Sequence, residues 1–230
     1  MNRLSLWNPE YFMKKPALNI SVFSDYICPF CYIGHLRLEA LRERYDLKIN
    51  WCFIEIHPET SAQGQSIDSL NYSHETWKKL MDNLQKLAAK ENITFCKQIM
   101  TTNSRQALLL SQEIKSLGAD IFYPFHQQLF SDYFINGKNI GDEDVLRDIA
   151  QQHNIPKSTI DKAWQDKYTH GPANATPDSL LPFLKYAGKL QTKSVPSFII
   201  GNQVLTGAVS KEALLTAAEK QIKSNSSKTL

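Results

Sequence analysis

The sequence predicts an α/β protein in which a split core is interrupted by a large helical insertion. Three observations support this class: a strand–helix–strand pattern at the start of the chain, a long helical pattern in its middle, and a hairpin followed by a helix near its end. The chain has 230 residues, of which 42% are hydrophobic, so it can bury a substantial core. We expect a discontinuous core of residues 1–59 and 193–224, an inserted helical domain of residues 60–192, and a frayed tail of residues 225–230.

The first unit is predicted by a change in hydrophobic period. Residues 18–23, LNISVF, alternate in character and are rich in β-branched and aromatic types, which indicates a strand. From Pro29 onward the apolar residues recur at steps of three and four, as on a helix that packs on a sheet. Residues 47–56, LKINWCFIEI, are mostly apolar and predict a second, buried strand. Together these segments predict a βαβ-like unit.

The carboxyl end predicts a hairpin and a closing helix. The segment SFII is separated from QVL by Gly201 and Asn202, a suitable two-residue turn. Ser210 is a suitable N-cap for a helix over about 210–222. Pro196 directly precedes this hairpin, and proline cannot pair within a central strand. Two interpretations of Pro196 stay open: a special turn with a cis peptide, or an ordinary strand-entry residue.

The middle of the chain is predicted to be entirely helical. Its apolar residues have helical spacing from Trp77 to Leu87, and Gly118 is a natural stop for the helix that precedes it. Asp142 is a suitable cap for a helix that runs to His153. The other expected helices cover residues 104–117, 121–134, 158–167 and 178–190.

Composition and charge exclude several classes of function. The formal net charge of +3 and the lack of a basic face argue against nucleic-acid binding. No segment approaches the roughly 18 apolar residues of a membrane span. The opening residues, MNRLSLWNPEYFMKKPALNI, lack the apolar run of a signal peptide, so we expect a cytoplasmic protein. In that compartment a cysteine pair is more often catalytic or metal-binding than structural.

The pair Cys28 and Cys31, in the motif CPFC, lies where the first strand is expected to meet the first helix. The free N–H groups of a helix N-terminus favour an anion, which stabilises a thiolate at Cys28. Pro29 suits the first helical turn because its missing N–H costs nothing there. Cys31, one turn further on, can face Cys28 and resolve a mixed disulfide. The residues therefore favour thiol–disulfide chemistry.

Two other interpretations of CPFC remain open, an idle structural pair and part of a zinc site. Cys28, Cys31 and His35 could share one helix face, but a structural zinc site needs four ligands. The sequence has no second C-x-x-C motif and no H-x-x-x-H motif to complete such a site. A non-catalytic module that binds a peptide or a metal therefore stays a lesser alternative.

Four stretches carry a resemblance to a known family: DYICPFCYIGHLRLE, IEIHPE, NSRQALLL and SVPSFIIGNQVLTGAVSKEALLTA. Over roughly residues 18–222 the chain resembles the DsbA-like family, and within it the cytoplasmic FrnE-type branch. The resemblance implies a thioredoxin-like fold with a large helical insertion, and an enzyme that acts as a thiol–disulfide oxidoreductase. It also implies that Cys28 attacks and Cys31 resolves. Pro196 would be the cis-proline that faces this pair, and the Val195 backbone would bind an extended substrate.

The same resemblance sets expectations about partners. Pro29 and Phe30 would join Val195 and Pro196 on the substrate-binding surface, and the substrates would be protein or small-molecule thiols and disulfides. No cofactor is expected besides the redox-active disulfide, with glutathione as a possible reductant. The protein would be a monomer or a homodimer. DsbA-like oxidases often carry histidine where this chain has Phe30, so we expect a pair less oxidising than DsbA, whose potential is about −120 mV.

A related branch offers the alternative function. It contains 2-hydroxychromene-2-carboxylate isomerases and kappa-class glutathione transferases, which typically carry serine at the first cysteine position and no second cysteine. Both cysteines are present here, which favours disulfide exchange. A glutathione-dependent isomerase or transferase of the same fold remains the alternative. A further departure is the stretch KLQTKSVP, which lacks the glycines that the FrnE-type branch often shows before its Val-Pro.

Five other residues have a structural and a functional interpretation. Cys52, on an apolar strand, is expected to act as a small buried hydrophobe. Cys96 is expected to be more exposed, as an ordinary thiol or as a third redox thiol. His35 would be a surface or packing residue, or would interact with the cysteines. His126 would pack in the insertion or line a substrate groove, and Arg105 would be solvated or would face the site.

Overall fold

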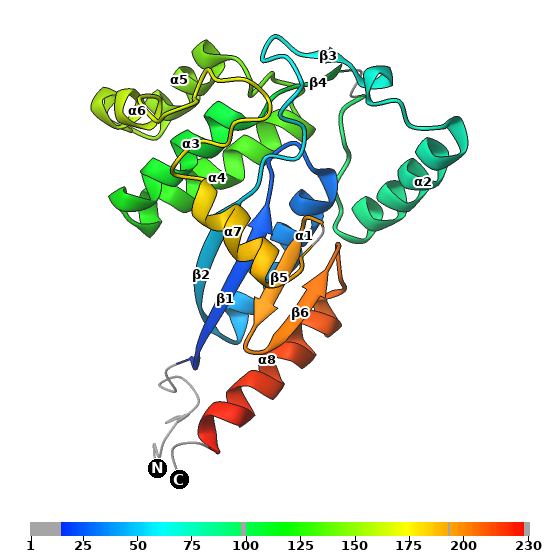
Figure 1. Ribbon diagram of the computed structural model, residues 1–230. Helices are drawn as coiled ribbons and strands as arrows, with labels where there is room; N and C mark the ends of the chain where they lie inside the picture. Colours follow the sequence, from blue (N-terminus) through cyan, green and yellow to red (C-terminus); the bar gives the residue numbers. More distant parts are fainter. Residues whose placement is uncertain (1–14, 98–99, 193, 228–230) are drawn as a thin grey trace, which may run out of the picture.

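The structure is a computed structural model that describes residues 15–97, 100–192 and 194–227 (Figure 1). Its centre is a four-stranded sheet in the order β2-β1-β5-β6. β1 and β2 are parallel, whereas β5 runs antiparallel to both β1 and β6. The strands are β1 (Ala17–Ser24), β2 (Asp46–Phe53), β5 (Ser197–Ile200) and β6 (Gln203–Thr206). This mixed sheet, joined from two ends of the chain, confirms the predicted α/β class.

Helices cover both faces of the sheet (Figure 1). Successive residues of a strand point to opposite faces, so Phe23 and its neighbours in β2 and β5 pack against Ala187 of α7 on one side. The other face packs against α1, which follows β1 directly and whose Gly34 lies against Phe198 of β5, and against α8 near the end of the described chain. These helices are α1 (Pro29–Glu39), α7 (Leu181–Lys189) and α8 (Lys211–Ser226).

The inserted segment supplies most of the remaining helices. α3 to α6 gather beyond the carboxyl end of β1, while α2 stands apart from them on the other side of the molecule (Figure 1). The helices are α2 (His74–Lys90), α3 (Arg105–Ile114), α4 (Ala119–Phe134), α5 (Glu143–Gln152) and α6 (Lys157–Ala163). Short 3-10 turns add η2 (Ala40–Glu43), η3 (Ile67–Leu70) and η4 (Lys115–Leu117). None of the helices in the described part of the chain has the length and apolar character of a membrane span.

The prediction that the insertion is entirely helical was wrong in one place. β3 (Gln65–Ser66) and β4 (Met100–Thr101) pair as a short antiparallel ribbon that ties the segment before α2 to the segment after it. Two residues are too few to produce the alternation by which a strand is recognised in a sequence. Two predicted caps were correct: Asp142 accepts a hydrogen bond from the Asp144 N–H, and Ser210 accepts one from the Ala213 N–H.

The predicted tail, 225–230, was also partly wrong, because α8 continues through Ser226. There the Ser226 hydroxyl donates to the Ile222 carbonyl, one turn back. Residues 228–230 of the tail lie outside the described residues, as do residues 1–14 and 193 of the predicted core. The division into a core and an inserted domain stays a prediction.

Candidate active site

Cys28 lies in the turn that joins β1 to α1. It is the N-cap residue of α1, with φ −90° and ψ 112°, and Pro29 occupies the first helical position as expected. Its carbonyl accepts hydrogen bonds from the backbone N–H groups of Cys31 at 3.0 Å and Tyr32 at 3.3 Å. Its own N–H donates to the Asp25 carbonyl at 3.3 Å, so the turn is held on both sides. The thiol is thereby placed at a helix N-terminus, where the backbone favours an anion.

Cys31 lies behind Cys28, within the core. Its side chain is 2% exposed, and all four cysteines are free, so this is the dithiol form. Burial, followed by a hydrogen bond with the Cys28 thiol, raises the pKa of Cys31 well above its ordinary value. The Asp25 backbone N–H and the Ser24 hydroxyl act in the opposite direction. The two thiols are therefore in contact, and the raised pKa keeps the Cys31 thiol protonated in the dithiol form.

The loop before β5 completes the site from the far end of the chain. The peptide bond between Val195 and Pro196 is cis. The Cys28 sulfur lies 3.8 Å from the Val195 carbonyl oxygen. Pro196 is buried, and Val195 is half-buried. The structure thus brings together the cysteine motif and the Val-Pro pair, which the resemblance had placed opposite each other.

A cavity of about 480 Å³ opens beside Cys28. Pro29, Phe30 and Val195 line it together with Cys28, whereas Cys31 and Pro196 do not. Its other wall comes from α2 and the segment before it, including Tyr72 and Trp77. Of the two cysteines of the motif, Cys28 is therefore the one that a molecule in this cavity can contact.

The sequence matches the family described as DSBA-like thioredoxin domain over residues 19–219. The chain belongs to this DsbA-like family. It is similar to the uncharacterized protein YwbO of Bacillus subtilis, with 24% identity over 209 residues that cover 90% of this chain and 98% of YwbO. The thioredoxin-like fold is confirmed by solved structures as well.

Two of these structures cover nearly the whole chain. The protein described as probable DsbA oxidoreductase SCO1869 of Streptomyces coelicolor aligns with a TM-score of 0.74 and 18% identity, over 90% of each chain. The cytosolic disulfide reductase DsbM of Pseudomonas aeruginosa, solved with GSH, aligns with a TM-score of 0.62 and 11% identity, over 93% of this chain and 100% of DsbM. At these identities the likeness concerns the fold.

Asp25 is a buried residue of this DsbA-like site that sequence reasoning missed. Its side chain is fully buried, and its carboxylate accepts hydrogen bonds from the N–H groups of Ile56 at 2.8 Å and Ile27 at 3.3 Å. Burial raises its pKa from 3.8 to about 7, against the effect of these hydrogen bonds. An acid at the end of a buried strand, three residues before Cys28, was the available signal. Through these hydrogen bonds Asp25 links the turn that carries Cys28 to the loop after β2.

Arg105 does not reach the cysteines, and the expectation of a solvated side chain was wrong. It is 4% exposed, and its Nε donates to both carboxylate oxygens of Glu55, at 3.2 and 3.0 Å. Asn103 donates to the same carboxylate at 2.9 Å, and Arg105 also donates to the carbonyls of Tyr168 and Gly171 at 3.0 Å. This buried cluster fastens α3 to the loop that follows β2.

The two histidines near the motif are core residues. His35 is 3% exposed and His126 is fully buried, with ring centroids 5.0 Å apart. The Tyr26 hydroxyl lies 2.6 Å from His126 Nδ1. His126 therefore does not line a groove, and His35 is neither on the surface nor beside Cys28 as a third zinc ligand. No group of three or more possible metal-binding side chains occurs among the described residues.

The two remaining cysteines differ in their surroundings. Cys52 is fully buried against α7, and burial raises its pKa to about 11, as expected of a cysteine that acts as a small hydrophobe. Cys96 is half-buried and lines the same cavity as Cys28. A redox role for Cys96 stays a prediction.

Proposed function

We propose that this protein is a thiol–disulfide oxidoreductase that exchanges disulfides with protein or small-thiol substrates through Cys28 and Cys31. The observation that carries the proposal is the placement of the two thiols. Cys28 caps α1 and borders a cavity, while the buried Cys31 contacts it from behind. Cys28 is itself 6% exposed, so a substrate reaches its sulfur from the cavity. An attacking thiol that borders a cavity, backed by a buried resolving thiol, is the arrangement that dithiol exchange requires.

In the reducing direction, the Cys28 thiolate attacks one sulfur of a substrate disulfide. The substrate S–S bond breaks, a mixed disulfide forms, and the first substrate thiolate leaves and takes a proton from water. Cys31 then loses its proton and attacks the Cys28 sulfur, which releases the second thiolate and closes the Cys28–Cys31 disulfide. Two electrons pass to the substrate. The Asp25 N–H and the Ser24 hydroxyl stabilise the Cys31 thiolate as it forms.

The oxidising direction is the reverse sequence, and the potential of the partner pool decides between the two. The Val195 backbone, 3.8 Å from the Cys28 sulfur, is placed to align an extended substrate with the reacting thiol. Glutathione is the reductant that we propose, and the cytoplasm is the compartment. Both the reductant and the compartment are supported by analogy of fold with DsbM, which is described as a cytosolic disulfide reductase and was solved with GSH.

The alternative, a glutathione-dependent isomerase or transferase, needs no resolving thiol. A redox titration separates the two functions: the protein is equilibrated in glutathione buffers of graded potential, free thiols are trapped, and mass spectrometry counts the blocked cysteines. We expect a reversible two-electron transition confined to Cys28 and Cys31, with a midpoint more reducing than about −120 mV. A pair that never closes, with a stable glutathione adduct on Cys28, would instead support the alternative.

A further inference from the structure

The long helix α2 is fixed to the core chiefly through its carboxyl half. Leu84 and Ala88 are buried against Ile33 of α1. Just after the helix, Glu91 accepts a hydrogen bond from Arg37 Nε at 2.7 Å, and both side chains are buried. Arg37 also donates to the Ala208 carbonyl at 2.6 Å. The second half of α2 is therefore fixed to the core.

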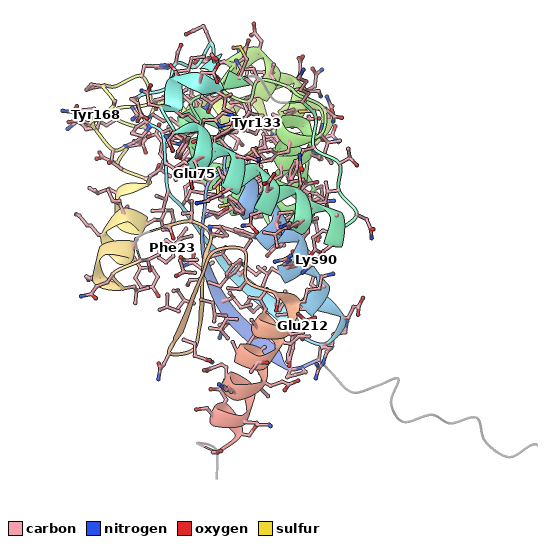
Figure 2. All side chains as sticks on the ribbon, turned by 90° about the vertical axis from the view of Figure 1, so that its right-hand side faces the viewer. Phe23, Glu75, Lys90, Tyr133, Tyr168 and Glu212 are labelled. Atoms are coloured by element: carbon pink, nitrogen blue, oxygen red, sulfur yellow. The ribbon has the colours of Figure 1, made fainter. Side chains whose placement is uncertain are left out.

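The first half of α2 continues the same apolar face, but its side chains are covered less completely by the core. Trp77, Leu80 and Met81, here called the α2 overhang, precede Leu84 at helical spacing, yet each is only half-buried. They line the cavity beside Cys28. Figure 2 shows α2 lying across this face of the molecule between Glu75 and Lys90. Packing of the fold accounts fully for Leu84 and in part for Met81, which packs against the Leu84 cluster. By contrast, Trp77 and Leu80 lie outside that cluster and border the cavity.

The cavity has the size and the lining of a small-molecule site. Its volume of about 480 Å³ lies within the range of roughly 300–1,000 Å³ typical of such sites. The overhang forms one wall, and Cys28, Phe30 and Val195 form the opposite wall. Because α2 covers the space from the solvent side, a compact molecule fits beneath the helix more readily than a polypeptide chain.

The cavity lacks charge. None of its described lining residues is Lys, Arg, Asp or Glu, and apart from thiols and tyrosines only His57 can titrate. Glutathione carries two carboxylates and an ammonium group, and burying a charge without a partner costs free energy. The part of a substrate that lies against the α2 overhang must therefore be uncharged.

We infer that the preferred substrate of Cys28 is a low-molecular-weight disulfide whose sulfur carries an uncharged aromatic or branched aliphatic group, and that this group binds in the cavity under α2. The inference rests on the proposed function. The reaction is the exchange described above: Cys28 takes one half of the substrate in a mixed disulfide, and Cys31 displaces it. Two apolar thiols leave, and the protein gains the Cys28–Cys31 disulfide.

The test is a single-turnover reaction of the reduced Cys96→Ser protein with matched disulfides, because this change leaves Cys28 as the one thiol among the described lining residues of the cavity. Dithiodipyridine is neutral and aromatic, dithiobis(nitrobenzoate) is aromatic but carries two carboxylates, and hydroxyethyl disulfide is small, neutral and polar. Oxidised glutathione and a disulfide-linked peptide with phenylalanine beside its cysteine complete the set. Each rate constant is divided by that of the same disulfide with free N-acetylcysteine, which removes the intrinsic reactivity of the probe.

Variants of α2 test whether the preference for apolar disulfides depends on the cavity. Leu80→Asp places a charge in the wall, and Asn83→Asp places the same charge on the exposed side of the same helix. The readout is the ratio of the dithiodipyridine rate to the hydroxyethyl disulfide rate. A changed thiolate fraction at Cys28 affects both rates and cancels in this ratio. Leu80→Ala, which adds no charge, is the second variant if Leu80→Asp fails to fold.

We expect the normalised rate for dithiodipyridine to exceed those for dithiobis(nitrobenzoate) and oxidised glutathione by about tenfold or more. Leu80→Asp should lower the readout ratio about tenfold, Leu80→Ala should lower it less, and Asn83→Asp should leave it within about twofold. Equal normalised rates, or a peptide that reacts faster than dithiodipyridine, would overturn the inference. If no probe closes the Cys28–Cys31 disulfide, the proposed function itself fails.

Discussion

Gly34 of α1 lies so close to Phe198 of β5 that no side chain fits between them. A Cβ atom on Gly34 would be 2.8 Å from Phe198 Cζ and 3.3 Å from Pro196 Cγ. The ring of Phe198 is fully buried and has no space into which it could retreat. The missing side chain thus lets the helix that carries the cysteines approach the loop that carries Val195.

We expect Gly34→Ala to destabilise the protein by about 1–3 kcal/mol, because the added methyl group overpacks the core. It should also slow exchange at Cys28, since Pro196 must move. Urea unfolding and single-turnover kinetics check the two effects. Gly188→Ala is the matched control: it lies in α7 with no atom within 4 Å of the added Cβ, so it should be neutral or slightly stabilising. Equal stability of the two variants would show that the contact is not tight.

Cys31→Ser should convert the protein into a trap for its substrates. The variant keeps the attacking thiol but cannot resolve the mixed disulfide, so the adduct on Cys28 should persist. Peptide mapping by mass spectrometry after incubation with a disulfide should show a persistent adduct on Cys28, distinguished from any adduct on Cys96 and released by a dithiol reductant. Cys52→Ser, which changes a buried cysteine outside the site, should still close the Cys28–Cys31 disulfide. Full turnover by the Cys31→Ser variant would contradict the assigned resolving role.

Asp25 should weaken the fold as the pH rises. Its folded pKa of about 7 lies above its ordinary value of 3.8, so the folded state holds the proton more tightly than the unfolded chain. Ionisation of this carboxyl therefore costs stability between about pH 4 and 7, and the cost is complete above pH 7. Relative to wild type, Asp25→Asn should gain about 2–4 kcal/mol between pH 4 and pH 8. Asp82→Asn, on the exposed side of α2, should show no such trend.

His35 should act in the opposite sense. Burial lowers its pKa from 6.5 to about 4, so the unfolded chain binds the proton more tightly than the folded one. Its contribution to stability is therefore lost as the pH falls from about 6.5 to 4, by about 3 kcal/mol at most. His35→Leu should flatten this part of the pH profile in urea unfolding, whereas His74→Gln, at an exposed position, should not. An unchanged slope in His35→Leu would locate the acid sensitivity elsewhere, with His126 as the next residue to test.

Local features of the fold were predictable because they depend on near neighbours in the chain. The alternation in LNISVF produced β1, the Gly201–Asn202 turn joined β5 to β6, and Pro29 began α1. The prediction was less accurate at the ends of elements. The second strand was expected to run to residue 56 but ends at Phe53, and beyond it the Ile56 N–H donates to the Asp25 carboxylate.

Outside the β3–β4 ribbon, the sequence by itself determined the order of strands and helices. It also determined the position of Cys28 at the start of α1 and the chemistry that two thiols one turn apart can perform. Only the tertiary structure decided what surrounds them. Val195 contacts Cys28 although the two lie 167 residues apart in the sequence, and Arg105 binds Glu55 at a sequence separation of 50 residues. Capping and periodicity are set within a few residues and can be read locally. Burial and the partners of a charged group depend on how distant segments pack, which no local pattern records.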